Sequence, residues 1–191
     1  AADYGMPQRR RRVYIYAEYD APKWDLENQL FHVGVEARAF PIEPDERFGA
    51  ENFSISKDPY NSTKEFGLGD KISRFKEAGV MQDGKVLTRR VEPVYNGPQR
   101  TLGEFLIPIE QVPEEFFITG DNLKSWEYLK GGKHEKRTAS NGHEYIYSEG
   151  PVAFPDPLDK PSRTILTGEG GRGASRTKHV VMQNGRLRRL V

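Results

Sequence analysis

The sequence predicts an irregular small domain of the α+β class, with short strands, hairpins and short helices. Two turns carry the first part of this prediction, because Asp83-Gly84 and Asn184-Gly185 each separate two strand-like runs and therefore indicate β-hairpins. Residues 18–70 are rich in Pro, Gly, Asp and Asn and show little hydrophobic periodicity, which is typical of loops and short elements. A chain of 191 residues is long enough to bury a core.

The first predicted element is a strand over residues 11–17. The β-branched Val13 and Ile15 alternate there with two tyrosines, so the segment suits a pleated sheet. Four consecutive arginines, residues 9–12, lead into it. The next clear element is a hairpin over residues 80–91, centred on the first of the two turns.

Three short helices are predicted in the middle of the chain. Thr101, with Glu104 three residues later, forms a weak capping box at the start of the first helix. Pro113 suits the first turn of the second helix. Asp121 is a candidate N-cap of the third helix, which continues through Lys130 and ends at a glycine pair.

The last third of the chain predicts strands separated by a proline-rich link. Residues 143–148 form the first strand, and residues 150–161 form the link. Residues 163–167 and 178–183 predict two more strands, the second of which turns into residues 186–191. No internal repeat is present.

The formal net charge of +1 conceals a separation of charge along the chain. Residues 1–12 have a net charge of +3, and residues 160–191 have a net charge of +7. Residues 13–159 contain 17 basic and 26 acidic residues, a net of −9. Because folding can bring the two basic ends to one face, we expect a polyanion such as nucleic acid as a partner. Two solvated basic termini are the alternative.

Composition excludes several classes of function. The chain has no cysteine, which excludes disulfides, thiolate metal sites and a cysteine nucleophile within these residues. No apolar run approaches the roughly 20 residues that cross a bilayer, and no signal peptide precedes the arginines, so we expect a cytoplasmic protein with no membrane partner. We expect no metal site, because no metal-ligand spacing relates the histidines His32, His134, His143 and His179.

A glycine-rich stretch, residues 168–173, matches the G-x-G-x-x-G pattern of nucleotide-binding loops. That function needs a helix N-terminus after the loop to receive the phosphates. Residues 178–183 are instead typical of a strand, so we expect no nucleotide site and no bound cofactor here.

Two widely separated motifs point to a family. Residues 7–15, PQRRRRVYI, resemble the Gln-x-Arg-x-Arg motif of the DNA cytosine-5 methyltransferases, with matches at Gln8, Arg10 and Arg12. Residues 161–181, PSRTILTGEGGRGASRTKHVV, resemble the next motif of that family, an Arg-x-x-x-Thr segment followed by a glycine-rich loop and an Arg-x-x-His strand. The matching residues of the second motif are Arg163, Thr167, Arg176 and His179.

This resemblance implies three segments. Residues 1–17 end a catalytic-domain segment and add a strand to the catalytic sheet. Residues 18–160 are the target recognition domain, which in this family reads the DNA sequence in the major groove. Residues 161–191 carry the second motif and begin the return to the catalytic domain. The implied function is DNA recognition by a bacterial DNA (cytosine-5-)-methyltransferase of a restriction-modification system.

Other parts of the family pattern are missing from these residues. The S-adenosylmethionine-binding loop, the Pro-Cys nucleophile and the Glu-Asn-Val segment are expected upstream of Ala1, and the family mechanism needs a thiolate. We therefore expect a piece of a larger enzyme that does not methylate DNA alone. Its expected partners are double-stranded DNA and the missing catalytic half. A stand-alone nucleic-acid-binding or scaffolding module is the alternative.

The resemblance implies a specific role for several residues of the arginine run. The enzyme must rotate its target cytosine out of the duplex, which requires fixed cationic donors at the mouth of the pocket. Arginine is permanently charged and forked, so it suits both base and phosphate. By resemblance Arg12 is the catalytic residue and contacts O2 of the flipped cytosine, Arg10 contacts the neighbouring phosphate, and Gln8 supports the loop and nearby DNA. We expect Arg9 and Arg11 to face solvent or an acidic neighbour, with a phosphate contact as the alternative.

Residues 121–138 are the best candidate for reading the DNA sequence, because they combine basic and aromatic residues with a glycine pair. An ordinary apolar helix stripe is the alternative; we expect Trp126 and Leu129 in the core and residues 130–138 against DNA. The glycine loop is the second candidate, running along a phosphate strand. Besides the arginine motif, the predicted DNA contacts are Lys130, Lys133, Lys136, Arg137, Thr138, Arg163, Thr167, Arg172 and Arg176.

Overall fold

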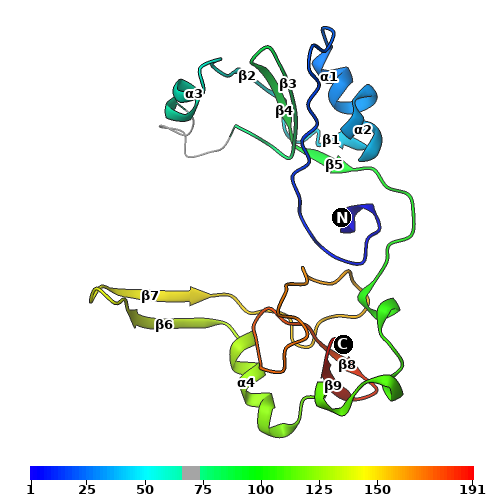
Figure 1. The fold of residues 1–191 in the computed structure, drawn as a ribbon, viewed down its shortest axis with the longest axis vertical. Helices are drawn as coiled ribbons and strands as arrows, with labels where there is room; N and C mark the ends of the chain where they lie inside the picture. The colour runs from blue at the N-terminus through cyan, green and yellow to red at the C-terminus, as the bar shows by residue number, and fades with distance from the viewer. Residues whose placement is uncertain (66–73) are drawn as a thin grey trace. The chain divides into compact units, whose positions relative to one another are not determined.

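The computed structural model describes residues 1–65 and 74–191 and divides the chain into two compact units (Figure 1). The first unit combines Ala1–Arg11 with Pro98–Val191, and the second unit is Arg12–Gly97. The predicted boundaries at residues 18 and 160 do not coincide with these units, so they stay a functional prediction. Residues 66–70 of the predicted loop stretch lie outside the described residues.

The first unit contains two antiparallel hairpins and one longer helix. The hairpins pair β6 (Lys133–Thr138) with β7 (Glu144–Glu149), and β8 (Val180–Gln183) with β9 (Arg186–Arg189). The helix is α4 (Gly120–Lys130). Short 3-10 helices make up much of the remainder: η1 (Ala2–Tyr4), η3 (Leu102–Phe105), η4 (Ile109–Gln111) and η5 (Glu114–Phe116).

The second unit contains two small antiparallel sheets. Three strands pair in the order β2 (Glu51–Ser54), β4 (Lys85–Arg89), β3 (Ala78–Gln82), and β1 (Ile42–Pro44) pairs with β5 (Val91–Pro93). Its helical elements are α1 (Leu26–Asn28), the π-helix η2 (Gln29–Val33), α2 (Val35–Ala39) and α3 (Pro59–Glu65). These short strands and helices confirm the predicted α+β class. None of the described helices is long and apolar enough to cross a membrane.

Both predicted hairpin turns are confirmed. Asp83 and Gly84 have φ angles of 52° and 77°, and Asn184 and Gly185 have φ angles of 46° and 76°. Two successive positive φ angles are what a two-residue type I′ turn requires, and Asn, Asp and Gly tolerate them best. The first turn joins β3 to β4, and the second joins β8 to β9.

All three predicted helices are present, and one of them starts earlier than predicted. Glu104 accepts a hydrogen bond from the Thr101 amide at 2.6 Å, as a capping box requires, although the helix is of the 3-10 type. The second is η5, which follows Pro113. The third, α4, begins at Gly120 with Thr119 as its N-cap, so Asp121 is not the cap but a residue of the first turn. Its carboxylate still suits the positive end of the helix dipole.

The predicted strand over residues 11–17 is wrong. Val13 and Ile15 are each 85% exposed, and among the described residues no strand pairs with this segment. High β propensity describes a side chain that fits a half-buried pleated surface. Because the described residues provide no such surface here, propensity alone does not produce a strand.

Two further differences concern the first unit. The predicted strand over residues 163–167 is wrong, because only the preceding Ser162 forms a bridge to another segment. Conversely, the sequence pattern does not predict β6, since KHEKRT contains no apolar residue that could alternate with polar ones. This strand forms because β7 pairs with it over six residue positions and offers Tyr145 and Tyr147 on one face.

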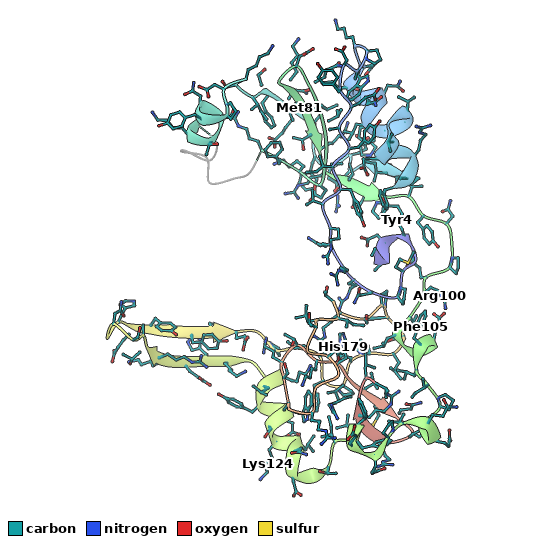
Figure 2. All side chains as sticks on the ribbon, viewed as in Figure 1. Tyr4, Met81, Arg100, Phe105, Lys124 and His179 are labelled. Carbon is teal, nitrogen blue, oxygen red and sulfur yellow. The ribbon has the colours of Figure 1, made fainter. Side chains whose placement is uncertain are left out.

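The core of the first unit is small. Trp126 on α4 and Val180 and Val181 on β8 are buried, which confirms the expected core position of Trp126. Leu129 is half-buried. Figure 2 shows the neighbouring His179 inside this unit, whereas Lys124 lies on the outer side of α4.

Candidate nucleic-acid interface

The two motif segments, about 150 residues apart in the sequence, lie side by side. The Ser162 amide donates to the Pro7 carbonyl at 2.7 Å, and the Arg9 amide donates to the Ser162 carbonyl at 2.8 Å. The Thr164 hydroxyl donates to the Arg9 carbonyl at 2.7 Å. Gln8 and Ser162 therefore form a short parallel bridge, which closes the long insert between the motifs.

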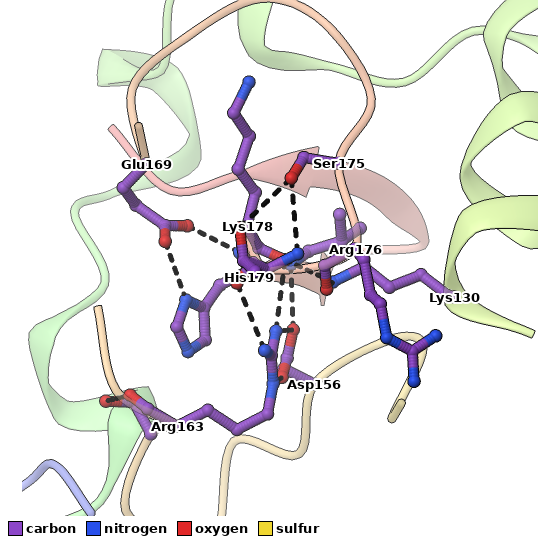
Figure 3. A network of polar contacts seen from close by, with 11 residues as sticks. Lys130, Asp156, Arg163, Glu169, Ser175, Arg176, Lys178 and His179 are labelled. Atoms are coloured by element: carbon purple, nitrogen blue, oxygen red, sulfur yellow. Dashed lines mark hydrogen bonds and ion pairs between the residues drawn. The ribbon is translucent and has the colours of Figure 1, made fainter. Parts of the chain in front are cut away.

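Arg163 occupies the centre of a polar network in the first unit (Figure 3). Its guanidinium donates to both carboxylate oxygens of Asp156, at 2.7 and 3.1 Å, and to the carbonyls of Thr177 and Lys178, at 3.1 Å each. Asp156 is buried and also accepts the Val180 amide at 2.9 Å. Arg163 thus has four internal acceptors, and its predicted DNA contact stays a prediction.

Lys130 is also an internal residue, with an exposed fraction of 1%. Its ammonium donates to the Arg176 carbonyl at 3.0 Å and to the Lys178 carbonyl. Burial lowers the pKa of Lys130 from 10.5 to about 8. The predicted DNA contact of Lys130 is therefore corrected, because its ammonium is buried and links the end of α4 to the segment before β8.

Arg176 connects the same region to the β6–β7 hairpin. Its guanidinium pairs with Glu149 at 2.7 Å and donates to the carbonyls of Leu129 and Gly131, at 3.2 and 3.3 Å. It also donates to the Gly150 carbonyl. These internal partners already bind the guanidinium, and the predicted DNA contact of Arg176 stays a prediction.

The glycine loop, residues 168–173, is held from its carbonyl side. Arg189 donates to the carbonyls of Gly170 and Gly171, at 3.3 and 2.5 Å. Lys178 donates to those of Gly171 and Gly173, at 2.7 and 2.6 Å. Two buried or half-buried cations therefore fix the course of the loop by binding its backbone oxygens.

Glu169 fixes the loop from within. Its carboxylate accepts the backbone amide of His179 at 2.5 Å and lies 3.0 Å from Nδ1 of the same residue. Burial alone would raise the pKa of this carboxyl, but the hydrogen bonds from His179 outweigh burial and hold the pKa of Glu169 below its usual value. The predicted motif residue His179 thus has a clear structural partner.

The outer side of the loop is open. A Cβ atom built on Gly168, Gly170 or Gly173 would meet nothing within 4 Å, and none of the three has a positive φ. Neither packing nor backbone conformation within the described residues therefore requires glycine there. Arg172 lies beside them with its side chain 81% exposed, paired to Glu115 at 2.6 Å.

Four further residues predicted to contact DNA lie on strand β6, and their side chains point to two opposite faces of the β6–β7 hairpin. Lys133 pairs with Glu149 at 3.3 Å, and Arg137 pairs with Glu135 at 3.1 Å. Lys136 and Thr138 lie on the opposite face and are exposed. Lys136 and Thr138 are therefore open to a partner, whereas Lys133 and Arg137 already pair with glutamates of the hairpin.

The N-terminal motif residues are mostly accessible. Arg10 and Arg12 are exposed, and Gln8 is half-buried by its bridge. Gln8 and Arg10 belong to the first unit, whereas Arg12 begins the second unit. Thr167, at the start of the glycine loop, is exposed. The predicted roles of these four residues stay predictions.

Sequence reasoning missed the residues that organise this region. Asp156 lies in a segment that reads as a proline-rich link, and Lys178 and Arg189 read as members of a basic tail. No sequence signal marks these three residues; the only acidic residue among residues 160–191, Glu169, has His179 as its partner instead.

Comparison with known proteins also relates the chain to methyltransferases. The chain is 34% identical over 201 aligned residues to the Type II methyltransferase M.Sau3AI of Staphylococcus aureus, an alignment that covers the whole chain and 46% of that protein. The chain is similar to part of a Type II methyltransferase. It spans about half the length of this curated relative. No family model matches the chain. No solved structure matches it either.

Arg163→Met should destabilise the first unit, because it leaves the buried Asp156 carboxylate without its cation. We expect the free energy of unfolding to fall by about 3–5 kcal/mol. Arg172→Met, which breaks an exposed pair, should cost less than about 1 kcal/mol. Urea titrations measure both values. A double variant with Asp156→Asn should recover part of the loss; similar losses for Arg163→Met and Arg172→Met would contradict the internal role.

Lys130 should give the stability a specific pH dependence. Below pH 8 both the folded and the unfolded chain hold its proton, whereas between about 8 and 10.5 only the unfolded chain does, so rising pH favours the folded state. Relative to Lys130→Met, the free energy of unfolding of the unmodified chain should therefore rise across this range by up to about 3 kcal/mol. Denaturant titrations of both proteins at pH 7 to 10.5 measure the difference, and a constant difference would show that the ammonium is not buried.

Proposed function

We propose that the chain is the DNA-recognition portion of a DNA (cytosine-5-)-methyltransferase, which binds duplex DNA and positions the flipped target cytosine. The observation that supports this most is the direct pairing of the two motif segments through Gln8 and Ser162, because two chance motifs have no reason to meet in space. The 34% identity to a Type II methyltransferase agrees with it. The expected setting is DNA methylation in the bacterial cytoplasm, within a restriction-modification system.

The chemistry of methyl transfer would come from the remainder of the enzyme. The family mechanism adds a thiolate to the cytosine ring, and these 191 residues contain no cysteine. S-adenosylmethionine would supply the methyl group and would bind to the catalytic half, the proposed protein partner. We therefore expect the chain alone neither to bind this cofactor nor to methylate DNA.

The arginine motif would hold the flipped nucleotide. Arg12 would donate to the cytosine O2, and Arg10 would bind the neighbouring phosphate. Gln8, which forms the bridge to Ser162, would support the loop and nearby DNA. The exposure of Arg10 and Arg12 leaves both accessible to DNA. A permanently charged guanidinium suits this site because it cannot lose its proton when the base enters.

The glycine loop would carry a phosphate strand of the DNA. Internal cations occupy the carbonyls of Gly170, Gly171 and Gly173, while no described residue accepts the amides of Gly168, Gly170 and Gly173. Backbone amides without an internal acceptor can donate to an anion such as a phosphate. Glycine there lets a DNA backbone approach closely, which explains a residue choice that intramolecular packing leaves unexplained.

Replacing Gly168, Gly170 and Gly173 together by alanine should weaken DNA binding without destabilising the fold. The added methyl groups meet no protein atom, but they would obstruct a phosphate strand. We expect the dissociation constant for duplex DNA to rise about fivefold or more, the equivalent of one lost hydrogen bond. Fluorescence anisotropy over a range of salt concentrations measures it.

Gly150→Ala is the matched control for this variant, because its Cβ also meets open space outside the glycine loop. It should leave both affinity and stability unchanged. If the triple variant binds DNA as tightly as the control, the glycine loop does not contact DNA.

Three arginine variants in the full-length protein separate the proposed roles. Arg12→Ala should lower turnover much more than duplex affinity, because its contact forms only with the flipped base. Arg10→Ala should also weaken binding and reduce the salt slope by about one contact. Arg9→Ala should have little effect. Methylation rates and binding isotherms at several salt concentrations distinguish them; equal losses for all three would mean an undifferentiated basic patch.

A further inference from the structure

Two neighbouring glutamates, Glu114 and Glu115, each pair with an accessible arginine of the first unit. The Glu115 carboxylate lies 2.6 Å from the guanidinium of Arg172, in the glycine loop. The Glu114 carboxylate lies 2.5 Å from the guanidinium of Arg186, the first residue of β9. The side chains of Arg172 and Arg186 are 81% and 49% exposed. Both cations can therefore meet a ligand, yet each already has an anion from the protein itself.

The fold holds the two carboxylates in place. They lie on η5 (Glu114–Phe116), which is attached to β9 at two points. The Arg189 guanidinium donates to the Glu115 carbonyl at 2.6 Å, and Phe117, directly after η5, forms an antiparallel bridge with Arg188. The glutamates therefore lie beside the two arginines because the backbone is fixed there, and not only because their side chains are flexible.

A phosphate can replace either carboxylate. Exposed ion pairs contribute little to stability, since water and salt screen them. The Arg186 guanidinium also lies 3.5 Å from the centre of the Phe117 ring, a contact that does not depend on Glu114. A phosphate offers arginine the same two charge-assisted hydrogen bonds as a carboxylate. The two arginines can therefore exchange an internal anion for an external one.

We propose that Glu114 and Glu115 compete with DNA phosphates for Arg186 and Arg172, and that this contact lowers the affinity for DNA of any sequence; this rests on the proposed function. Arg172 belongs to the glycine loop, so a phosphate strand on the open outer side of the loop meets the Arg172–Glu115 pair. Phosphate contacts carry no sequence information. Competition for two of them leaves a larger share of the binding free energy to contacts that depend on sequence.

The alternative is that the two pairs only stabilise the first unit. Loss of a carboxylate would then leave DNA affinity unchanged, apart from the general effect of removing one negative charge from a protein that binds a polyanion. Competition predicts a larger gain of affinity, and it predicts that the gain requires the paired arginine.

Glu115→Gln in the 191-residue chain tests the competition, because it nearly keeps the shape of the side chain and removes the charge that holds Arg172. We expect the dissociation constant for a duplex of random sequence to fall about two- to fivefold further than in the control variant, the range that exposed ion pairs contribute. Glu114→Gln should have a similar effect through Arg186. Fluorescence anisotropy at low salt measures both.

Glu110→Gln is the matched control. Glu110 is exposed and lies on the neighbouring η4, and within the described part of the chain no ion pair involves it. This variant therefore measures the general effect of one lost negative charge. Arg172→Met supplies the second control: in its background Glu115→Gln should raise the affinity no more than Glu110→Gln does, because no arginine remains to be released.

The outcomes separate this inference from the proposed function. If neither the unmodified chain nor any variant binds duplex DNA, both are overturned. If the unmodified chain binds but Glu114→Gln and Glu115→Gln raise the affinity no more than Glu110→Gln, only the competition is overturned. An equal gain from Glu115→Gln with and without Arg172 would also overturn it. Unfolding curves of the variants confirm that each is folded.

Discussion

Hydrogen bonds from side-chain cations to backbone carbonyls organise the C-terminal third of the first unit. This part of the chain is largely irregular, so few of its carbonyls have strand or helix partners, and backbone carbonyls need hydrogen-bond donors. Side-chain cations supply the missing donors. The Arg163–Asp156 pair is the centre of this arrangement, since Arg163 binds two carbonyls and Asp156 also receives the amide of Val180. Lys130, Arg176, Lys178 and Arg189 extend it.

This constraint changes what the basic C-terminal segment can do. The first unit contains 17 basic and 13 acidic residues, yet several of its cations are directed inward. Burial lowers the pKa of Arg188 and of Arg189, as expected for charges withdrawn from water. The surface proposed for DNA is therefore smaller than the total charge implies and consists of the exposed arginine motif and the open outer side of the glycine loop.

The elements that the sequence predicts well are those fixed by local chemistry. Asp83-Gly84 and Asn184-Gly185 specify their turns through backbone preferences alone, and Trp126 is apolar enough to be placed in the core. The failures depend on distant partners. Val13 and Ile15 form no strand because no described strand pairs with them. Strand β6 forms because it pairs with β7. Lys130 is buried because its ammonium donates hydrogen bonds to two backbone carbonyls. Residue type gives no sign of these contacts.

The most direct test of the central claim is an NMR titration of the arginine side chains with duplex DNA. Internal guanidinium groups should show slow proton exchange at Nε and unchanged signals when DNA is added, as we predict for Arg163 and Arg189. The exposed Arg10 and Arg172 should exchange rapidly and shift on binding. Rapid exchange of Arg163 together with a large shift on addition of DNA would contradict the account, because its guanidinium would then face the duplex instead of Asp156.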